Sequence, residues 1–416
     1  MSPTNLQLGN FNFHAKCVTH FALRILRDKM IICIIFVIKL KLIMKTTNPF
    51  PTSEYISPEF FCDRETELKQ MIESIDNQRN ITIISRRRLG KTALIKHCFH
   101  HLKKRKDISL HYFDIYATRN LNEFVNILST ALIGYFESKP EKILSQLIKM
   151  LGQFRPKLTF DELSGAPSVE LSLQTQAETE QSLAAIFSYL AKQKQRVIIA
   201  IDEFQQITNY PEKNVEALLR THIQANNNVN LIYSGSNRRM LISLFDDYAR
   251  PFYQSTGFLF LEKIDPAQYK SFISKHFKNA RRKISSDALS FILDWAQGHT
   301  YFVQEICNRV YSAGDTAIDI KDVKQVTLQI LEERTPLYQV YQNMLTASQY
   351  ALLKAIAFET NIDKPNSSVF LTKYKLGAAS SVIRSLEALE TKDLIFYENN
   401  IYSLTDIFLM RWLQRQ

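Results

Sequence analysis

Short apolar segments alternate with longer amphipathic segments over residues 80–261. The β-branched run at 81–85 predicts a strand, and apolar positions recurring every three or four residues from 92 to 104 predict a helix after it. The same criteria predict a helix at about 121–137 and further strands at 108–116, 197–202, 230–235 and 257–261. Apolar strands that alternate with helices are typical of a parallel sheet. We therefore expect an α/β fold in which helices sandwich a parallel sheet.

The rest of the chain has different patterns. Residues 265–334 are helical throughout, which predicts a small all-α domain. Helical patterns around 348–358 and 378–391 then precede two short strands in LIFYENNIYSLTD, an arrangement typical of a winged helix. Residues 138–185 have weaker periodicity, and their segment SGAPSVELSLQ predicts either a loop or a small hairpin.

Composition agrees with several globular domains. The 416 residues exceed what one hydrophobic core usually serves, and 45% hydrophobic with 22% charged residues is ordinary for a folded protein. Glycine is scarce (10) whereas Phe (27) and Tyr (18) are frequent, which favours a helix-rich α/β protein. The five cysteines are scattered without CxxC spacing, so we expect reduced thiols in the cytoplasm and no cysteine-bound metal.

The N-terminal segment, residues 1–43, differs from the rest in charge. It holds six basic side chains against one acidic, about half of the formal net charge of +11, and the remaining basicity is diffuse. Its apolar run Met30–Ile38 is much shorter than the roughly 20 residues that cross a bilayer. No small-residue cleavage site follows, so we expect neither a membrane span nor a secretory signal. We interpret 1–43 as an upstream extension of a protein that starts at Met44.

The segment SRRRLGKT joins the first predicted strand to its helix. It resembles the pattern G-x-x-x-x-G-K-[ST], in which backbone N–H groups wrap phosphates, the lysine reaches the β- and γ-phosphates and the hydroxyl ligates Mg²⁺. Ser85 stands where glycine is usual, and its side chain is able to crowd the turn. The alternative is a GKT tripeptide that merely begins a helix. The predicted ATP-binding residues of this segment are Ser85, Arg86, Arg87, Arg88, Leu89, Gly90, Lys91, Thr92 and Ala93.

A second polar group follows the apolar strand VIIAID, at the edge where open parallel sheets bind ligands. Asp202 is expected to hold Mg²⁺ with Thr92, and Glu203 to orient or deprotonate the attacking water. Together with Lys91 these two carboxylates form the predicted catalytic set. The alternative is a helix N-cap. After the next strand, a polar side chain is expected to sense the γ-phosphate, and Ser236 is our candidate.

These motifs resemble the archaeal-type ATPase family within the AAA+/STAND P-loop proteins, especially bacterial members that begin with an NPF segment. The resemblance runs from Asn48-Pro49-Phe50 through FCDRETEL, SRRRLGKT, IIAIDEFQ, YSGSNRRM and RPFYQST to GHTYFVQEIC and the winged helix. It implies that Phe61 and Arg64 contact the nucleotide near its adenine. It also implies that GHTYFVQ contacts the nucleotide from a helical lid, with Thr300 where proline is usual.

The resemblance further implies a domain order and a mechanism. We expect a P-loop ATPase core at 44–264, a helical lid at 265–340 and a winged helix at 341–416. Nucleotide between core and lid would act as a switch, with Mg²⁺-dependent ATP hydrolysis and with a protein partner or self-assembly as output.

Two alternative functions stay open. The first is a winged-helix ATPase or regulator that binds DNA, although residues 340–416 carry eight basic and seven acidic side chains and a DNA-reading surface is usually more basic. The second is a scaffold that binds nucleotide without turnover.

Overall fold

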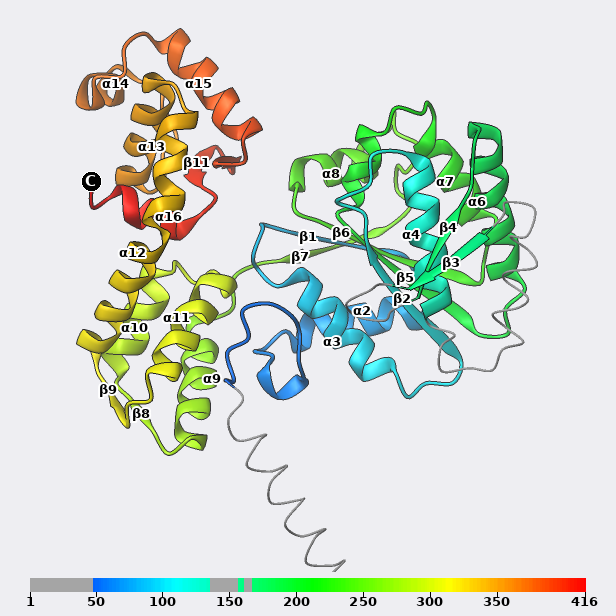
Figure 1. Cartoon of the computed structure of the whole chain (residues 1–416), viewed down its shortest axis with the longest axis horizontal. Coiled ribbons are helices and arrows are strands. Elements are labelled where there is room, and N and C mark those ends of the chain that lie inside the picture. Colours follow the sequence, from blue (N-terminus) through cyan, green and yellow to red (C-terminus); the bar gives the residue numbers. More distant parts are fainter. Residues whose placement is uncertain (1–47, 135–155, 161–166) are drawn as a thin grey trace, which may run out of the picture.

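The computed structural model describes residues 48–134, 156–160 and 167–416. The predicted extension, 1–43, and much of 138–185 therefore lie outside the described residues. A sheet body, drawn in blue to green, lies beside a helical region drawn in yellow to red (Figure 1). Residues of both parts line the candidate site.

The sheet body is built on five parallel strands in the order β2-β5-β6-β1-β7. Their bounds are β1 Ile81–Ser85, β2 Ile108–Asp114, β5 Arg196–Asp202, β6 Val229–Gly235 and β7 Gly257–Leu261. In register, Asp114 pairs with Asp202, and Ile84 pairs with Gly235. The carboxyl ends of neighbouring strands consequently share one edge, which is where parallel sheets place ligands.

Helices cover both faces of this sheet, as the sequence predicts. Ile83 and Ile198 belong to the core beneath α2 and α3, whereas Ile84 and Ile199 belong to the core beneath α4, α6, α7 and α8. Adjacent residues of a strand face opposite sides, so both faces need apolar side chains and the strands are apolar throughout. The helices are α2 Glu65–Asp76, α3 Lys91–Leu102, α4 Leu121–Gly134, α6 Gln176–Ala191, α7 Val215–Gln224 and α8 Arg238–Asp246.

An antiparallel hairpin lies between α4 and α6. It pairs β3 (Pro156–Phe160) with β4 (Pro167–Leu171), which confirms the hairpin alternative for the segment SGAPSVELSLQ. Helix α6 starts within the stretch that showed weak periodicity. Thr175 and Glu178 form a reciprocal capping box at its start, a local signal in the sequence that our prediction did not use.

The helical region after β7 is tied to the first described residues. Phe50 is fully buried among aromatic side chains of α9 and α11, including Phe277 and Tyr311. Asn48 donates from Nδ2 to the Asn308 carbonyl at 2.7 Å, so the NPF segment is held by hydrogen bonds as well as by packing. The elements of this region are α9 Pro266–Asn279, α10 Ser286–Trp295, α11 Thr300–Ala313, α12 Ile320–Met344 and the short paired strands β8 Lys283–Ile284 and β9 Ala317–Ile318.

The winged helix shares one hydrophobic core with this region. Trp412 donates from Nε1 to Thr335 Oγ1 at 2.9 Å, which joins the last helix to α12. The hairpin turn uses Asn399 and Asn400 with φ of 51° and 62°, a conformation that asparagine tolerates in two-residue turns. The elements are α13 Ala347–Glu359, α14 Ser368–Tyr374, α15 Ala379–Thr391, β10 Ile395–Glu398, β11 Ile401–Leu404 and α16 Ile407–Leu413. Sequence periodicity missed the two seven-residue helices, α14 and α16.

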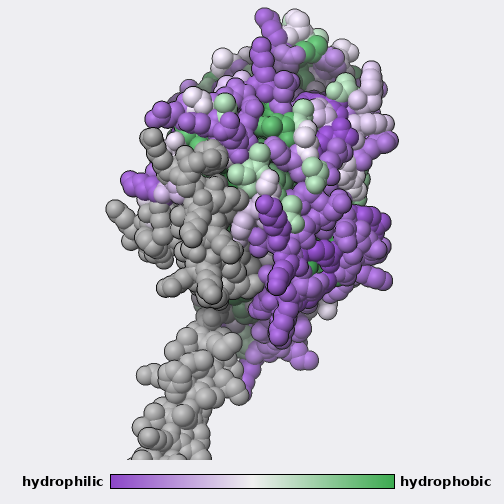
Figure 2. All heavy atoms as spheres, turned by 90° about the vertical axis from the view of Figure 1, so that its right-hand side faces the viewer, coloured by the Kyte–Doolittle hydropathy of each residue, from purple (hydrophilic) through white to green (hydrophobic). Residues whose placement is uncertain are grey.

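The face of the sheet body that points away from the helical region is mostly hydrophilic with small apolar spots (Figure 2). In the part of the chain that the structure describes, no helix is long and apolar enough to cross a membrane.

Candidate functional site

The loop between β1 and α3 carries two left-handed residues, and neither is Ser85. Gly90 has φ of 94° and Arg88 has φ of 68°, whereas Ser85 ends a strand and its hydroxyl donates to the Arg86 carbonyl at 2.8 Å. The serine therefore fits an extended position at the start of the loop. The glycine-like conformation is required later, at Arg88 and Gly90.

The start of α3 presents free backbone amides. Its first intrahelical hydrogen bond runs from Leu94 N–H to the Gly90 carbonyl at 2.9 Å, so the amides of residues 91–93 precede the ladder and lie at the positive end of the helix. Lys91 is only 7% exposed. Burial lowers the pKa of Lys91, while the nearby carboxylates of Glu203 and Asp202 act in the opposite direction. This end of the helix is suited to an anion.

Asp202 is the centre of a hydrogen-bond network at the sheet edge. Thr92 Oγ1 donates to its Oδ2 at 2.6 Å, and the Glu203 amide donates to its Oδ1 at 3.0 Å. Ser234 also donates to Oδ1 from the neighbouring strand β6. The hydroxyl of Thr92 and the carboxylate of Asp202 are hard oxygen donors side by side, the type that Mg²⁺ prefers. The two predicted metal ligands therefore lie together and fit that ion.

Glu203 occupies a strained position after β5. Its φ is 55°, and the short helix η4 (Phe204–Asn209) follows without any side-chain cap bond from Glu203. The Glu203 carboxylate instead accepts from Ser236 Oγ at 2.8 Å and from Gln205 Nε2 at 2.6 Å. Glu203 stands at the N-cap position of this short helix but makes no side-chain capping bond, so the N-cap alternative does not account for its carboxylate. The contact with Ser236 places our candidate sensor directly against our candidate water-activating residue.

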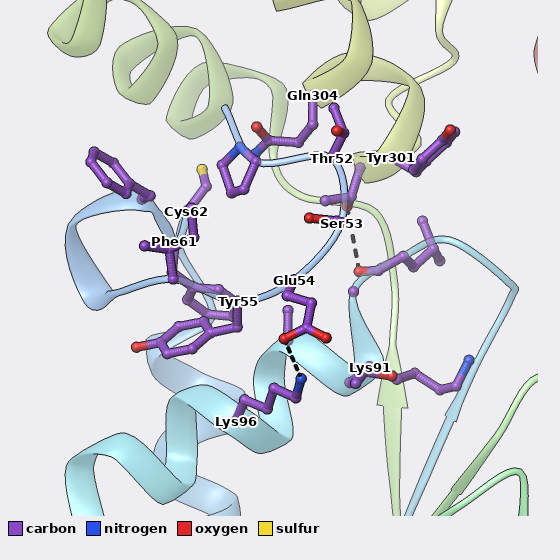
Figure 3. Close-up of a pocket in the computed structure, with 18 of the residues that line it drawn as sticks. Thr52, Ser53, Glu54, Tyr55, Phe61, Cys62, Lys91, Lys96, Tyr301 and Gln304 are labelled. Carbon is purple, nitrogen blue, oxygen red and sulfur yellow. Dashed lines mark hydrogen bonds and ion pairs between the residues drawn. The ribbon is translucent and has the colours of Figure 1, made fainter. Parts of the chain in front are cut away.

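A cavity of about 470 Å³ lies between α3, α11 and the segment after the NPF motif (Figure 3). Phe61 lines it and stacks on His97 with ring centroids 4.1 Å apart. Arg64 lines it too, but its guanidinium donates to Glu67 and to the Glu262 carbonyl. The predicted site residues that line the cavity are Phe61, Arg64, Arg88, Leu89, Gly90, Lys91, Thr92 and Ala93.

The helical region touches the loop through the start of α11. Tyr301 N–H donates to the Arg88 carbonyl at 3.1 Å, and Thr300 Oγ1 donates to the Leu89 carbonyl at 3.4 Å. Both contacts are made to the loop backbone, so a displacement of the loop also acts on α11. His299, directly before this helix, is 5% exposed, and burial lowers its pKa to about 3, with Lys263, Arg86 and Arg88 acting in the same direction.

The three arginines of the loop form ion pairs with the winged helix, although Arg88 also lines the cavity. Arg86 pairs with Glu398, and Arg87 pairs with Asp393. Arg88 Nη1 lies 2.8 Å from Asp406, whose carboxylate also caps α16. The carboxylate of Glu398 is 12% exposed and receives a second arginine, Arg238, at 2.5 Å.

Comparison with known proteins identifies the sheet body. A model of the family described as an "ATPase domain predominantly from Archaea" matches residues 61–306. The chain belongs to this family. A second model, described as a "Probable winged helix domain", matches residues 336–415 of the chain.

Solved structures agree with this fold. The Walker-type ATPase PABY2304 of Pyrococcus abyssi is 19% identical with a TM-score of 0.60, and the match covers 88% of this chain and 99% of that one. The Aeropyrum pernix ORC2 protein, solved as ADPNP–ADP complexes, is 15% identical with a TM-score of 0.54, and coverage is 88% and 96%. No curated protein matches.

Sequence reasoning missed two residues of the candidate site, both on β2. Tyr112 donates from its hydroxyl to Asp202 Oδ2 at 3.1 Å, and burial raises the pKa of Tyr112, which keeps it a donor. Asp114 faces the same carboxylates, and burial together with Asp202 and Glu203 raises the pKa of Asp114. A signal was present, because ISLHYFD and RVIIAID end in aspartates that parallel pairing brings to one edge. The winged-helix carboxylates had no comparable signal.

Proposed function

We propose that this protein is an ATP-binding, Mg²⁺-dependent ATPase that acts as a nucleotide-dependent switch. The observation that carries the proposal is that one short loop serves two purposes. Its end at Lys91 lies against the carboxylates of the sheet edge, while its arginine side chains pair with the winged helix. Movement of the loop at the phosphates therefore acts directly on the winged-helix contact.

The roles of the residues follow from their contacts. Lys91 and the amides at the start of α3 bind the phosphates, and Thr92 with Asp202 holds Mg²⁺, which supplies charge neutralisation when bound. Glu203 orients the attacking water and accepts its proton. Ser236, already bonded to Glu203, is placed to sense whether the γ-phosphate is present. Phe61, Arg64, Leu89 and Ala93 line the nucleotide cavity, and Ser85, Arg86, Arg87 and Arg88 shape the loop.

Coupling requires that ATP and ADP favour different arrangements of the loop and the winged helix. The ion pairs of Arg86, Arg87 and Arg88 are partly exposed, with arginine side chains that are 33%, 46% and 34% accessible. Exposed pairs of this kind contribute little each, roughly 0–1 kcal/mol, so docking is reversible. The three pairs together still define one docked orientation.

We propose a protein partner or self-assembly as the output rather than DNA. In α15, the helix expected to read DNA in a winged helix, Arg384 bonds to Ser381 of the same helix and Glu387 is exposed. An exposed carboxylate on that surface opposes binding to phosphates. We also propose a cytoplasmic location, which is consistent with the buried free thiols of Cys62, Cys98 and Cys307. The proposed domains are the core to residue 264, the lid at 265–340 and the winged helix at 341–416.

The test is phosphate release by the purified protein with Mg²⁺ and ATP, compared with Glu203→Gln. We expect turnover to fall by about 10²- to 10⁴-fold because the base is lost, while ATP affinity is retained. Exposed Glu170→Gln serves as a charge-matched control with normal turnover. Equal background release from wild type and Glu203→Gln, together with normal ATP binding, would leave the scaffold without turnover as the better description. Absence of ATP binding in the wild type would remove the proposal altogether.

A further inference from the structure

The cavity beside the phosphate-binding loop has two chemically different ends. Gly90, Lys91 and Thr92 form one end, which offers backbone amides and an ammonium group. The other end is lined by Phe61 and Ile264, together with Cys62 and Tyr55 (Figure 3). Polar phosphates and an apolar base are the two ends of a nucleotide, so this polarity gives the bound molecule one direction.

Gln304 of α11 lies at the apolar end. Gln304 lines the cavity and is only 7% exposed. Its Oε1 has no hydrogen-bond partner among the described residues. Figure 3 shows Gln304 reaching from α11 toward the side of the cavity where Cys62 lies, at the opposite end of the view from Lys91. A buried acceptor without a partner is unfavourable, and a ligand that donates a hydrogen bond there removes the penalty.

Tyr269 fixes which end of the amide is available. Its fully buried hydroxyl donates to the Thr300 carbonyl at 3.3 Å, so the hydroxyl oxygen is left to accept. The amide of Gln304 lies near this hydroxyl and opposes the rise that burial causes in the pKa of Tyr269. An amide whose nitrogen faces Tyr269 offers its carbonyl oxygen to a ligand, and this oxygen is the atom of Gln304 that is buried without a partner among the described residues.

Two polar side chains near Gln304, those of Arg64 and Cys62, are either already hydrogen-bonded or uncharged. Arg64 donates to Glu67 and to the Glu262 carbonyl. Burial raises the pKa of the Cys62 thiol to about 12, so it is uncharged at neutral pH. Neither side chain competes with Gln304 for a donor on the ligand.

We infer that Gln304 selects the base of the bound nucleotide by accepting a hydrogen bond from the 6-amino group of adenine. The inference rests on the proposed function, because it takes the cavity as the nucleotide site. A 6-oxo purine, as in guanine or hypoxanthine, presents an acceptor at this position and leaves the oxygen of Gln304 opposed by another oxygen. Gln304 is thus a specificity-determining residue, whereas Tyr269 is a positioning residue that holds its amide.

The experiment is calorimetric titration of the full chain with Mg²⁺ and each of three ligands: ATP, inosine triphosphate and purine riboside triphosphate, which lacks any 6-substituent. We expect wild type to bind ATP about tenfold more tightly than either analogue, the usual effect of one hydrogen bond to a buried acceptor. In Gln304→Met, a change of similar size, ATP affinity should fall about tenfold to the level of purine riboside triphosphate, whose own affinity stays unchanged. In Tyr269→Phe the amide is free to rotate, so discrimination against inosine triphosphate should shrink.

The outcomes separate this inference from the proposed function. If wild type binds none of the triphosphates more tightly than Lys91→Ala does, the nucleotide site itself is absent. If wild type binds ATP and both analogues equally, the site stands and Gln304 does not read the base. An equal loss of affinity for all three ligands in Gln304→Met also overturns the inference, because it indicates a structural role. Unchanged binding of purine riboside triphosphate to Gln304→Met shows that this variant is folded.

Discussion

The two ends of the phosphate-binding loop are stabilised in different ways. At the Lys91 end, the lysine and Asp202 are 7% and 3% exposed, and the groups near them, Thr92 and Glu203, belong to the same sheet body. At the arginine end, the partners Glu398, Asp393 and Asp406 come from a domain about three hundred residues away and the pairs are partly solvated. The first arrangement is rigid and suited to binding and chemistry. The second is weak and reversible, which is what a signal needs.

The largest expected effect is at the rigid end. Lys91→Ala should weaken ATP binding by at least about 100-fold, because charge-assisted hydrogen bonds to phosphates contribute about 1.5–3 kcal/mol each. Calorimetry or a fluorescent nucleotide measures it. Lys103→Ala, at the exposed far end of α3, is the control and should bind normally. Unaltered affinity in Lys91→Ala would remove the nucleotide assignment.

The next effect is at the arginine end. Replacing Asp393, Glu398 and Asp406 together by their amides should undock the winged helix. Loss of the largely buried Glu398 carboxylate, which pairs with two arginines, costs about 1–3 kcal/mol, and the exposed pair of Asp393 adds less than about 1 kcal/mol. Asn at 406 still caps α16, so the helix remains intact. Hydrogen exchange in β10 and β11 should become faster, and added salt should mimic the change in wild type.

A charge-matched control distinguishes these contacts from net charge. Neutralising Asp363, Glu387 and Glu390, which belong to the same domain and make no ion pair among the described residues, should leave exchange in the hairpin unchanged. If both triple variants accelerate exchange equally, the loop arginines do not hold the winged helix.

His299 lies between the two regions and should make stability depend on pH. Burial lowers the pKa of His299 from 6.5 to about 3. The stability that the neutral His299 side chain contributes is therefore fully present above pH 6.5 and is lost as the pH falls toward 3. Lowering the pH from 7.5 to 5.5 should therefore reduce the free energy of unfolding by about 1 kcal/mol through this residue. Urea unfolding at several pH values measures this effect. The free energy of unfolding should depend less steeply on pH in His299→Gln than in wild type. Exposed His101→Gln is the reference, and the same slope in both variants would contradict the assignment.

The smallest effect is expected at Ser85. Ser85→Gly should change ATP affinity by less than about threefold, because Ser85 has an extended backbone and needs no glycine. Ser85→Ala, which removes only the hydroxyl bond to Arg86, should behave alike. A gain of tenfold or more in Ser85→Gly alone would show that the side chain crowds the loop.

The elements and the sheet-edge chemistry were predictable because their signals are local. Apolar runs mark β1, β5 and β6, and Gly90 to Thr92 lies directly between a strand and a helix. The short helices α14 and α16 were missed because seven residues hold too few turns for a periodic pattern. Start signals were nevertheless present, since Ser367 and Asp406 cap these two helices.

By itself, the sequence determined the α/β fold and the identity of the residues at the sheet edge, because neighbouring parallel strands bring their carboxyl ends together whatever the rest of the chain does. Only the tertiary structure decided the direction of the three loop arginines and the isolation of the Gln304 oxygen in the cavity. The physical reason is that an ion pair or an unsatisfied acceptor depends on which distant side chains approach it, and no local pattern records that approach.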